Sequence, residues 1–258
     1  MKLVDTHAHL YLKQFAADRS QVLENARKAG LTKIYLPNID VKSIDPMIEL
    51  EAQSEGFCEA MMGLHPCSVK ADFEKSLEVI EDWLNKRPFC AVGEIGLDLY
   101  WDKSTLEIQQ VAFRQQIRWA KKLGIPIVVH TRESMDQALD LIESELDESL
   151  SGIIHCFGGT PEQAQRIIDM GFYMGIGGVI TYKKSGLAQT LASVPLEHLV
   201  LETDAPYLTP VPFRGKRNES AYIKIIAQHL ADAKKTSIEE IARLTTANAE
   251  KIFRKKRG

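Results

Sequence analysis

Apolar runs rich in β-branched residues recur along the chain at a fairly regular pitch, and longer segments with helical spacing separate them. The runs lie at residues 3–7, 32–38, 59–65, 89–96, 125–130, 152–157, 172–178 and 198–204. They are continuously apolar rather than alternating, as expected for strands that are covered on both faces. The pattern therefore predicts strands that alternate with helices along the whole chain.

The segments between these runs carry helix start and stop signals. Residues 104–107 read Ser-Thr-Leu-Glu, which is typical of a capping box, and they open a long amphipathic segment that ends at Gly124. Thr160 and Pro161 read as an N-cap followed by proline at the first helical position. The segment from about residue 237 onward predicts an extra helix packed on the outside.

Eight strands alternating with helices in 258 residues have the size and rhythm of an α/β fold of the TIM (β/α)8 barrel type. A doubly wound open sheet would usually have fewer strands or a glycine-rich phosphate loop after its first strand, and no GxGxxG motif follows the first run. No linker rich in proline, glycine or serine divides the chain. We therefore expect one barrel domain over residues 1–258, with the helix from about 237 as an addition.

Composition narrows the class of protein. With 45% hydrophobic and 26% charged residues the chain is ordinary for a globular protein, and it has neither a signal-peptide pattern nor an apolar run long enough to span a membrane. We expect a cytoplasmic protein with no membrane partner. Cysteines 58, 67, 90 and 156 have no CxxC spacing, so we expect them to be reduced.

Charge argues against one class of nucleic-acid binder. The net charge of −3 does not favour a protein that coats duplex nucleic acid through a broad basic surface, although a local pocket for an anionic substrate is compatible with it. The basic run at residues 251–258 is expected to be a solvated tail.

Potential ligands follow the predicted strands at the points where they end. In a barrel, the carboxyl ends of all strands meet at one rim, where active sites lie. The residues placed there are His7, His9, His65, Glu94, His130, His155 and Asp204. His7 and His9 are two residues apart, so in an extended chain both rings point to the same face. His198, at a strand start, and His229, within a helix, are expected to be structural or surface residues.

Six of these residues have the chemistry of a metal site: His7, His9, Glu94, His130, His155 and Asp204. They are too many for one tetrahedral ion with an open position, but they suit two divalent ions with Glu94 as the bridge. Two such ions would leave the site with roughly one positive charge, which favours an anionic substrate. The ions would lower the pKa of a bound water, and Asp204 would orient that water or accept its proton.

The residues therefore indicate metal-assisted hydrolysis with Glu94 and Asp204 as catalytic residues. Imidazole ligands favour zinc or a similar transition ion, whereas nucleases commonly use magnesium or manganese, so zinc, magnesium and manganese all stay open.

Seven motifs in order between residues 5 and 219 carry a family resemblance: DTHAHL, GLHP, GEIGLDLYW, VVHTRES, IIHCFGG, ETDAPYLTP and PFRGKRNE. The chain closely resembles the TatD family of metal-dependent hydrolases, described mainly as deoxyribonucleases. The resemblance implies a TIM barrel of the amidohydrolase-like superfamily, a first metal held by His7, His9, Glu94 and Asp204, and a second held by Glu94, His130 and His155. It also implies that His65 and Arg132 lie near the substrate phosphate.

Two positions depart from the usual family pattern. Ser220 follows Glu219 where the family often has proline, and Cys67 follows the GLHP segment where many members have another histidine. Both departures leave the candidate ligands intact. They leave open the subfamily and its preference among DNA, RNA and smaller phosphoesters.

Two further groups of residues are candidates for substrate binding. In the PFRGKRN loop, Arg214, Lys216 and Arg217 offer donors for a nucleic-acid backbone, although the loop also reads as a solvent-exposed basic turn. Three aromatic residues in rim loops would stack against bases or would simply pack the loops: Tyr100, Trp101 and Tyr207.

The sequence favours a dinuclear metal-dependent phosphodiesterase, a deoxyribonuclease resembling a 3′–5′ exonuclease, which acts on DNA ends or single-stranded DNA without an obligatory protein partner. One alternative is a hydrolase of a small cyclic amide, lactone or phosphoester, although superfamily members acting on cyclic amides and lactones often have a carboxylated lysine where this chain has Glu94. Another alternative is a catalytically silent metal-binding protein, which the complete set of six ligands disfavours.

Overall fold

The computed structural model describes residues 1–254, and the end of the basic run, residues 255–258, lies outside the described residues. Each of the eight apolar runs overlaps one strand of the described chain. The strands are β1 (Leu3–Asp5), β2 (Leu31–Leu36), β3 (Cys58–Ala60), β4 (Val92–Asp98), β5 (Ile127–Arg132), β6 (Gly152–Ile154), β7 (Tyr173–Ile176) and β8 (Leu199–Leu201).

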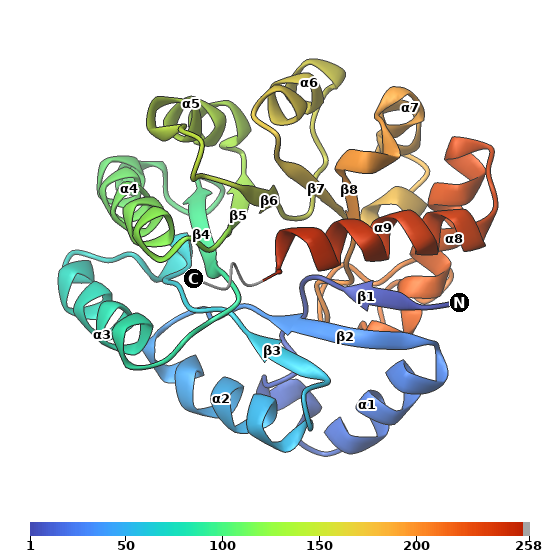
Figure 1. The fold of residues 1–258 in the computed structure, drawn as a ribbon, viewed down its shortest axis with the longest axis horizontal. Helices are drawn as coiled ribbons and strands as arrows, with labels where there is room; N and C mark the ends of the chain where they lie inside the picture. Colours follow the sequence, from blue (N-terminus) through green and yellow to red (C-terminus); the bar gives the residue numbers. More distant parts are fainter. Residues whose placement is uncertain (255–258) are drawn as a thin grey trace.

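The strands form parallel ladders in the orders β1-β2-β3 and β4-β5-β6-β7-β8. Backbone hydrogen bonds connect the two groups at both seams. Between β3 and β4, the N–H of Gly93 donates to the carbonyl of Met62 at 3.1 Å, and between β8 and β1, the N–H of Thr6 donates to the carbonyl of Leu201 at 3.0 Å. The ring of strands is therefore closed, and the predicted TIM barrel is confirmed (Figure 1).

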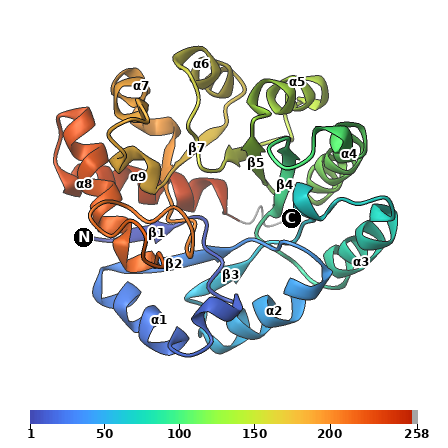
Figure 2. The ribbon, with the colours of Figure 1, turned by 180° about the vertical axis from the view of Figure 1, so that it is seen from behind.

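Helices surround the strands, as Figure 2 shows from behind. The helices are α1 (Arg19–Lys28), α2 (Ile44–Gln53), α3 (Phe73–Lys86), α4 (Leu106–Leu123), α5 (Met135–Glu145), α6 (Pro161–Asp169), α7 (Leu187–Ser193), α8 (Ile223–Lys234) and α9 (Ile238–Ile252). None of those in residues 1–254 combines the length and apolarity that a membrane crossing requires.

Helix boundaries follow the sequence signals with one exception. The α4 helix ends at Leu123, and Gly124 takes a left-handed φ of 63°. Thr160 caps α6 and Pro161 is its first residue, as predicted, and Gln163 completes a reciprocal capping box. The predicted capping box at residues 104–107 is wrong: the Asp102 carboxylate accepts from both the backbone N–H and the hydroxyl of Ser104, and a 3-10 turn at Lys103–Thr105 precedes α4. The earlier aspartate therefore takes the capping role.

The barrel interior is filled at the end opposite the predicted site. Inward-facing side chains from or beside every strand form one apolar cluster with the last turn of α9, and they include Val4, Tyr35, Met61, Val128, Ile153, Tyr173 and Val200. Phe253 stacks on Tyr35 with ring centroids 3.8 Å apart. The α9 helix, which crosses the barrel in Figure 1, therefore covers this end of it.

Candidate metal centre

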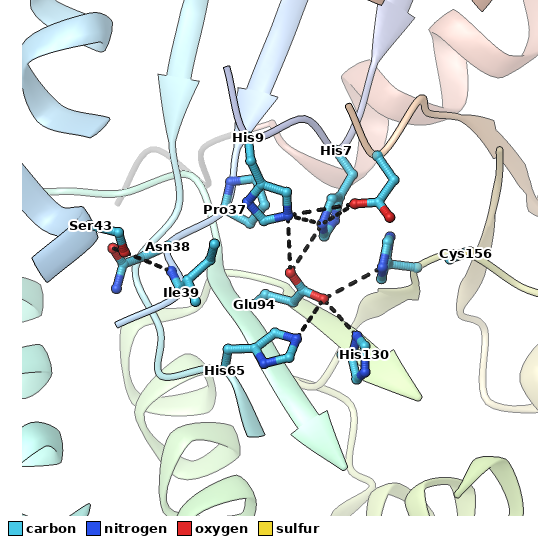
Figure 3. A network of polar contacts seen from close by, with 12 residues as sticks. His7, His9, Pro37, Asn38, Ile39, Ser43, His65, Glu94, His130 and Cys156 are labelled. Atoms are coloured by element: carbon cyan, nitrogen blue, oxygen red, sulfur yellow. Dashed lines mark hydrogen bonds and ion pairs between the residues drawn. The ribbon is translucent and has the colours of Figure 1, made fainter. Parts of the chain in front are cut away.

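The six candidate ligands meet at the carboxyl ends of the strands. His7 and His9 follow β1, His155 follows β6 and Asp204 follows β8, while Glu94 and His130 lie within β4 and β5. All except the partly exposed His130 are buried. Figure 3 shows Glu94 between His7 and His9 on one side and His65 and His130 on the other. The closed barrel thus brings together residues from positions 7 to 204 of the chain.

Glu94 presents its two carboxylate oxygens to two different groups of histidines. Its Oε2 lies 3.1 Å from His7 Nε2 and 3.5 Å from His9 Nε2. Its Oε1 lies 2.9 Å from His130 Nδ1 and 3.5 Å from His155 Nε2. This is the arrangement that a carboxylate bridging two ions requires.

The first group has the spacing of a tetrahedral site. At metal–ligand distances of about 2.0–2.2 Å, tetrahedral donor atoms lie roughly 3.3–3.6 Å apart. His7 Nε2 and His9 Nε2 are 3.3 Å apart, and Asp204 Oδ1 lies 3.8 Å from the first and 3.5 Å from the second. Glu94 Oε2 and the two imidazole nitrogens form a compact group, and Asp204 Oδ1 lies near the same two nitrogens, so these residues offer up to four donors to one divalent ion.

The second group has fewer protein donors. Glu94 Oε1, His130 Nδ1 and His155 Nε2 supply three, so an ion held there would keep open positions for water or substrate, as catalytic metal sites do. The two groups lie side by side, since the rings of His7 and His155 stack with centroids 3.6 Å apart.

In three of the histidine rings, a hydrogen-bond partner determines which nitrogen faces the centre. Tyr11 donates its hydroxyl proton to the carbonyl of Pro37 at 2.6 Å, so its oxygen accepts from His9 Nδ1 at 2.9 Å. The Nδ1 of His9 therefore carries the ring proton, and its Nε2 is free to bind a metal.

Two carboxylates orient the histidine rings of the second donor group in the same way. His130 Nε2 donates to Asp98 Oδ2 at 2.9 Å, which leaves its Nδ1 free. His155 Nδ1 donates to Glu202 Oε1 at 2.9 Å, so its Nε2 faces the centre and binds a metal once it has lost its proton. These are carboxylate–histidine pairs of the kind that orient metal ligands.

The Glu202 side chain packs against a glycine, Gly175. A Cβ at Gly175 would come within 2.0 Å of Glu202 Oε2, so glycine at that position makes room for the carboxylate. The Glu202 side chain is fully buried, and its Oε1 also accepts from the N–H of Cys156 at 2.7 Å. Its Oε2 has no hydrogen-bond partner among the described residues.

Buried polar side chains also fix the backbone around the centre. The side-chain Nδ2 of Asn38 donates to the backbone carbonyl of Gly63 at 2.8 Å. The backbone carbonyl of Asn38 accepts from the N–H of Glu94 at 3.1 Å. Asp5 accepts from the N–H and hydroxyl of Thr203 at 2.9 and 2.6 Å, which ties β1 to the segment that leads to Asp204.

His65 lies at the centre but in the wrong tautomer for a ligand. Its Nδ1 accepts from the N–H of Cys67 at 3.0 Å, and burial lowers the pKa of the ring, so the neutral imidazole carries its proton on Nε2. That N–H points at Glu94 Oε1, 3.4 Å away. His65 can therefore donate to an oxygen at the centre but has no lone pair there for a metal.

The electrostatics favour bound cations. Burial alone would raise the pKa of Glu94, but His7, His65 and His155 hold it well below its ordinary value. Burial would likewise lower the pKa of His155, yet Glu202 and Glu94 raise it to about 10. The buried carboxylates thus stabilise positive charge at the centre. Divalent ions can supply that charge in place of protons on the histidines.

The basic residues predicted to bind substrate lie on two segments, the end of β5 and the loop after β8. The guanidinium of Arg132 lies 3.7 Å from the ring centroid of Tyr100, and that of Arg214 lies 4.3 Å from that of Tyr182. Lys216 is exposed. Arg217 is turned back onto the protein, where it donates to both carboxylate oxygens of Asp18 at 2.8 and 2.6 Å.

The remaining predicted positions lie around or apart from the centre. Tyr207 faces His9 edge-on at 6.1 Å. His198 and His229 bond through Nδ1 to the backbone carbonyls of Phe172 and Ile225. The sequence interpretation did not single out Tyr11, Asp98 or Glu202, because their roles depend on which imidazole nitrogen they contact in the folded chain.

The chain is similar to known proteins over nearly its whole length. A family model described as TatD related DNase matches residues 4–254. The chain is 38% identical over 253 residues to the Bacillus subtilis protein described as uncharacterized metal-dependent hydrolase YabD, covering 98% of this chain and 99% of that one. It is 32% identical to a Pantoea ananatis protein described as 3′-5′ ssDNA/RNA exonuclease TatD, covering 97% and 99%.

A solved structure agrees with these sequence matches. The crystal structure of YjjV, a TatD homolog from Escherichia coli K12, aligns with a TM-score of 0.92 at 31% identity over 97% of each chain. The chain therefore belongs to the TatD-related DNase family of metal-dependent hydrolases.

Proposed function

We propose that this protein is a dinuclear metal-dependent phosphodiesterase that trims DNA ends or single-stranded DNA in the manner of a 3′–5′ exonuclease. The observation that carries the proposal is the position of Glu94, whose two oxygens each face a separate group of histidines. A site of this kind is suited to an in-line displacement at phosphorus, in which both the attacking and the leaving oxygen need stabilisation.

The residues have complementary roles in this proposal. His7, His9, Glu94 and Asp204 would hold one ion, and Glu94, His130 and His155 would hold the other. When bound, zinc, manganese or magnesium ions would lower the pKa of a water and polarise the phosphoryl group. Asp204 would orient the attacking water or accept its proton, and the Nε2–H of His65 would donate to a phosphate oxygen.

Two observations support a polymeric anion as the substrate. The Pantoea ananatis relative carries the description of an exonuclease of single-stranded DNA and RNA. In addition, the loops after β7 and β8 form one exposed basic rim, which we define as Lys183, Lys184, Arg214 and Lys216. The hydroxyl of Tyr182 donates to the carbonyl of Thr209 at 3.0 Å and thereby joins the two loops.

The test is cleavage of single-stranded DNA labelled at its 5′ end. Purified protein loaded in turn with zinc, manganese and magnesium is expected to shorten the strand from its 3′ end. Glu94→Gln is expected to lower the rate by at least about 100-fold, because it removes the charge that both ions share. Glu107→Gln, on the exposed face of α4, is the matched control and should cleave like the wild type. The proposal fails if the strand stays intact or if Glu94→Gln cleaves normally.

The same preparations separate the alternative functions. Faster turnover of a lactone, cyclic amide or small phosphoester than of the strand would assign the centre to a small substrate. If the metals were purely structural, their removal by chelation would lower the unfolding temperature steeply, and the loaded protein would turn over no substrate. Under our proposal, chelation abolishes cleavage while the circular dichroism of the barrel is retained. Elemental analysis of protein prepared without chelator would identify the ions.

A further inference from the structure

Two large aromatic side chains lie exposed at the mouth of the barrel, on the side of the second donor group. Tyr100 and Trp101 follow β4 after Leu99, and they are 48% and 72% exposed. Arg132, the last residue of β5, is also exposed. An exposed tryptophan is common enough on protein surfaces, so its contacts must decide whether this one forms part of a binding surface.

The three side chains form one ordered cluster. The Tyr100 and Trp101 rings meet edge to face with centroids 4.8 Å apart. The Arg132 guanidinium lies 3.7 Å from the Tyr100 centroid and 5.5 Å from that of Trp101. The described residues give Arg132 no carboxylate partner. The cluster therefore presents aromatic faces together with a cation that no acid neutralises.

A single carboxylate links this cluster to the metal centre. Asp98 Oδ1 accepts from the N–H of Tyr100 at 3.1 Å, while Asp98 Oδ2 accepts from His130 Nε2 at 2.9 Å. The N–H of Leu99 donates to the carbonyl of Arg132 at 2.9 Å, which joins the two loops. The cluster therefore lies beside the donor group that has open positions.

Space is available next to the indole. A hollow of about 100 Å³ opens beside Trp101, and its walls include Cys67, Val69 and Asp98. Because most of the Trp101 ring is exposed, a planar group can reach its face without displacing a core side chain.

We infer that Trp101, with Tyr100 and Arg132, binds the nucleobase next to the reacting phosphate of a single strand, an inference that rests on the proposed function. Stacking on an aromatic ring accepts any base, because every base has a π-face. Arg132 is placed to meet the flanking phosphate, since a guanidinium can grip a phosphate through two donors. The cluster would thus favour polynucleotides over phosphoesters that lack a base.

The experiment compares strands that differ only in their bases. Full-length protein with chelator, so that the strand is not consumed, is titrated with labelled oligothymidylate and with an abasic strand of the same length. KM is then measured for both strands on the metal-loaded protein. We expect Trp101→Ala to weaken oligothymidylate binding by roughly 5- to 150-fold and to leave abasic binding unchanged. Trp101→Phe should retain most of the affinity.

Tryptophan fluorescence gives an independent readout. Oligothymidylate should quench the wild-type emission, and the quenching should disappear in Trp101→Phe, where Trp83 and Trp119 still emit. Val111→Ala, at another exposed apolar side chain on α4, serves as the control.

The inference is overturned if Trp101→Ala binds both strands as the wild type does, or if the wild type shows no preference for the strand with bases. If the protein cleaves both strands alike while Trp101→Ala changes nothing, only the stacking role is lost. If the metal-loaded wild type cleaves neither strand, the proposed function itself fails.

Discussion

Each histidine of the candidate centre can bind a metal only in one of its two neutral tautomers. Tyr11, Asp98 and Glu202 select that tautomer for His9, His130 and His155. His7 has no such partner, because its Nδ1 is buried without a hydrogen bond among the described residues. The directions of the donors therefore depend on side chains that do not contact the ions.

Glu202 offers the sharpest test of this arrangement. In Glu202→Gln, the amide oxygen can still accept from His155 Nδ1 and the N–H of Cys156, but the negative charge is lost. We expect metal affinity and hydrolysis to fall by about 10- to 100-fold, with an unchanged fold. Isothermal titration with zinc measures the affinity. Glu197→Gln, an exposed glutamate before β8, should have no effect. Equal affinities in the two variants would contradict the orienting role.

Protonation of the same rings predicts how metal affinity depends on pH. Burial opposes charge on His155, but Glu202 and Glu94 raise its pKa to about 10, so the metal-free protein holds this proton between pH 6 and 8. Metal binding must release it. The affinity should therefore rise with pH, by about tenfold per unit for each proton released. Titration in buffers of different ionisation enthalpy counts the protons. An affinity that stays constant with pH would contradict this linkage.

At the scale of elements, the strand pattern predicted most of the fold and the candidate ligands, because parallel strands place their carboxyl ends at one rim. The same rule placed Glu94, His130 and Asp204 together without knowledge of any contact. It could not show that Arg217 turns back onto Asp18, since the direction of a loop side chain is set by neighbours far away in sequence. It also placed the last helix only on the outside, whereas the end of α9 packs into the barrel interior.

A substitution at Phe253 measures how much the end of α9 contributes to the stability of the barrel. Its ring is 5% exposed and stacks on Tyr35 inside the barrel end. Phe253→Ala should lower the free energy of unfolding by about 3 kcal/mol, because it leaves a cavity in a packed cluster. Urea denaturation measures the loss, and Val111→Ala should stay within about 0.5 kcal/mol of the wild type. Metal affinity should not change, since the centre lies at the opposite end. A loss below 1 kcal/mol would mean that α9 adds little.

At the scale of the whole molecule, a chain of negative net charge carries a group of exposed basic side chains on two of its rim loops. The chain has a net charge of −3, yet the basic rim of Lys183, Lys184, Arg214 and Lys216 lies on loops beside the candidate centre. A negatively charged body with a local basic rim is suited to one strand held at one place, rather than to a duplex wrapped over a surface.

Salt dependence tests the basic rim. The affinity for single-stranded DNA should fall as salt rises, with a slope in the double-logarithmic plot of about 0.7 for each phosphate contact. Arg214→Gln combined with Lys216→Gln should reduce that slope by roughly 1.4. Fluorescence anisotropy at several salt concentrations provides the slope. Lys122→Gln, at the far end of α4, should leave it unaltered, and an unaltered slope in the double variant would exclude the rim from strand binding.

The apolar plug formed by α9 and the inward-facing strand side chains has a consequence for any polymer processed here. This cluster closes the end of the barrel opposite the candidate centre, so a strand has no route through the barrel. Under the proposed function, each released nucleotide must leave by the way the strand came in.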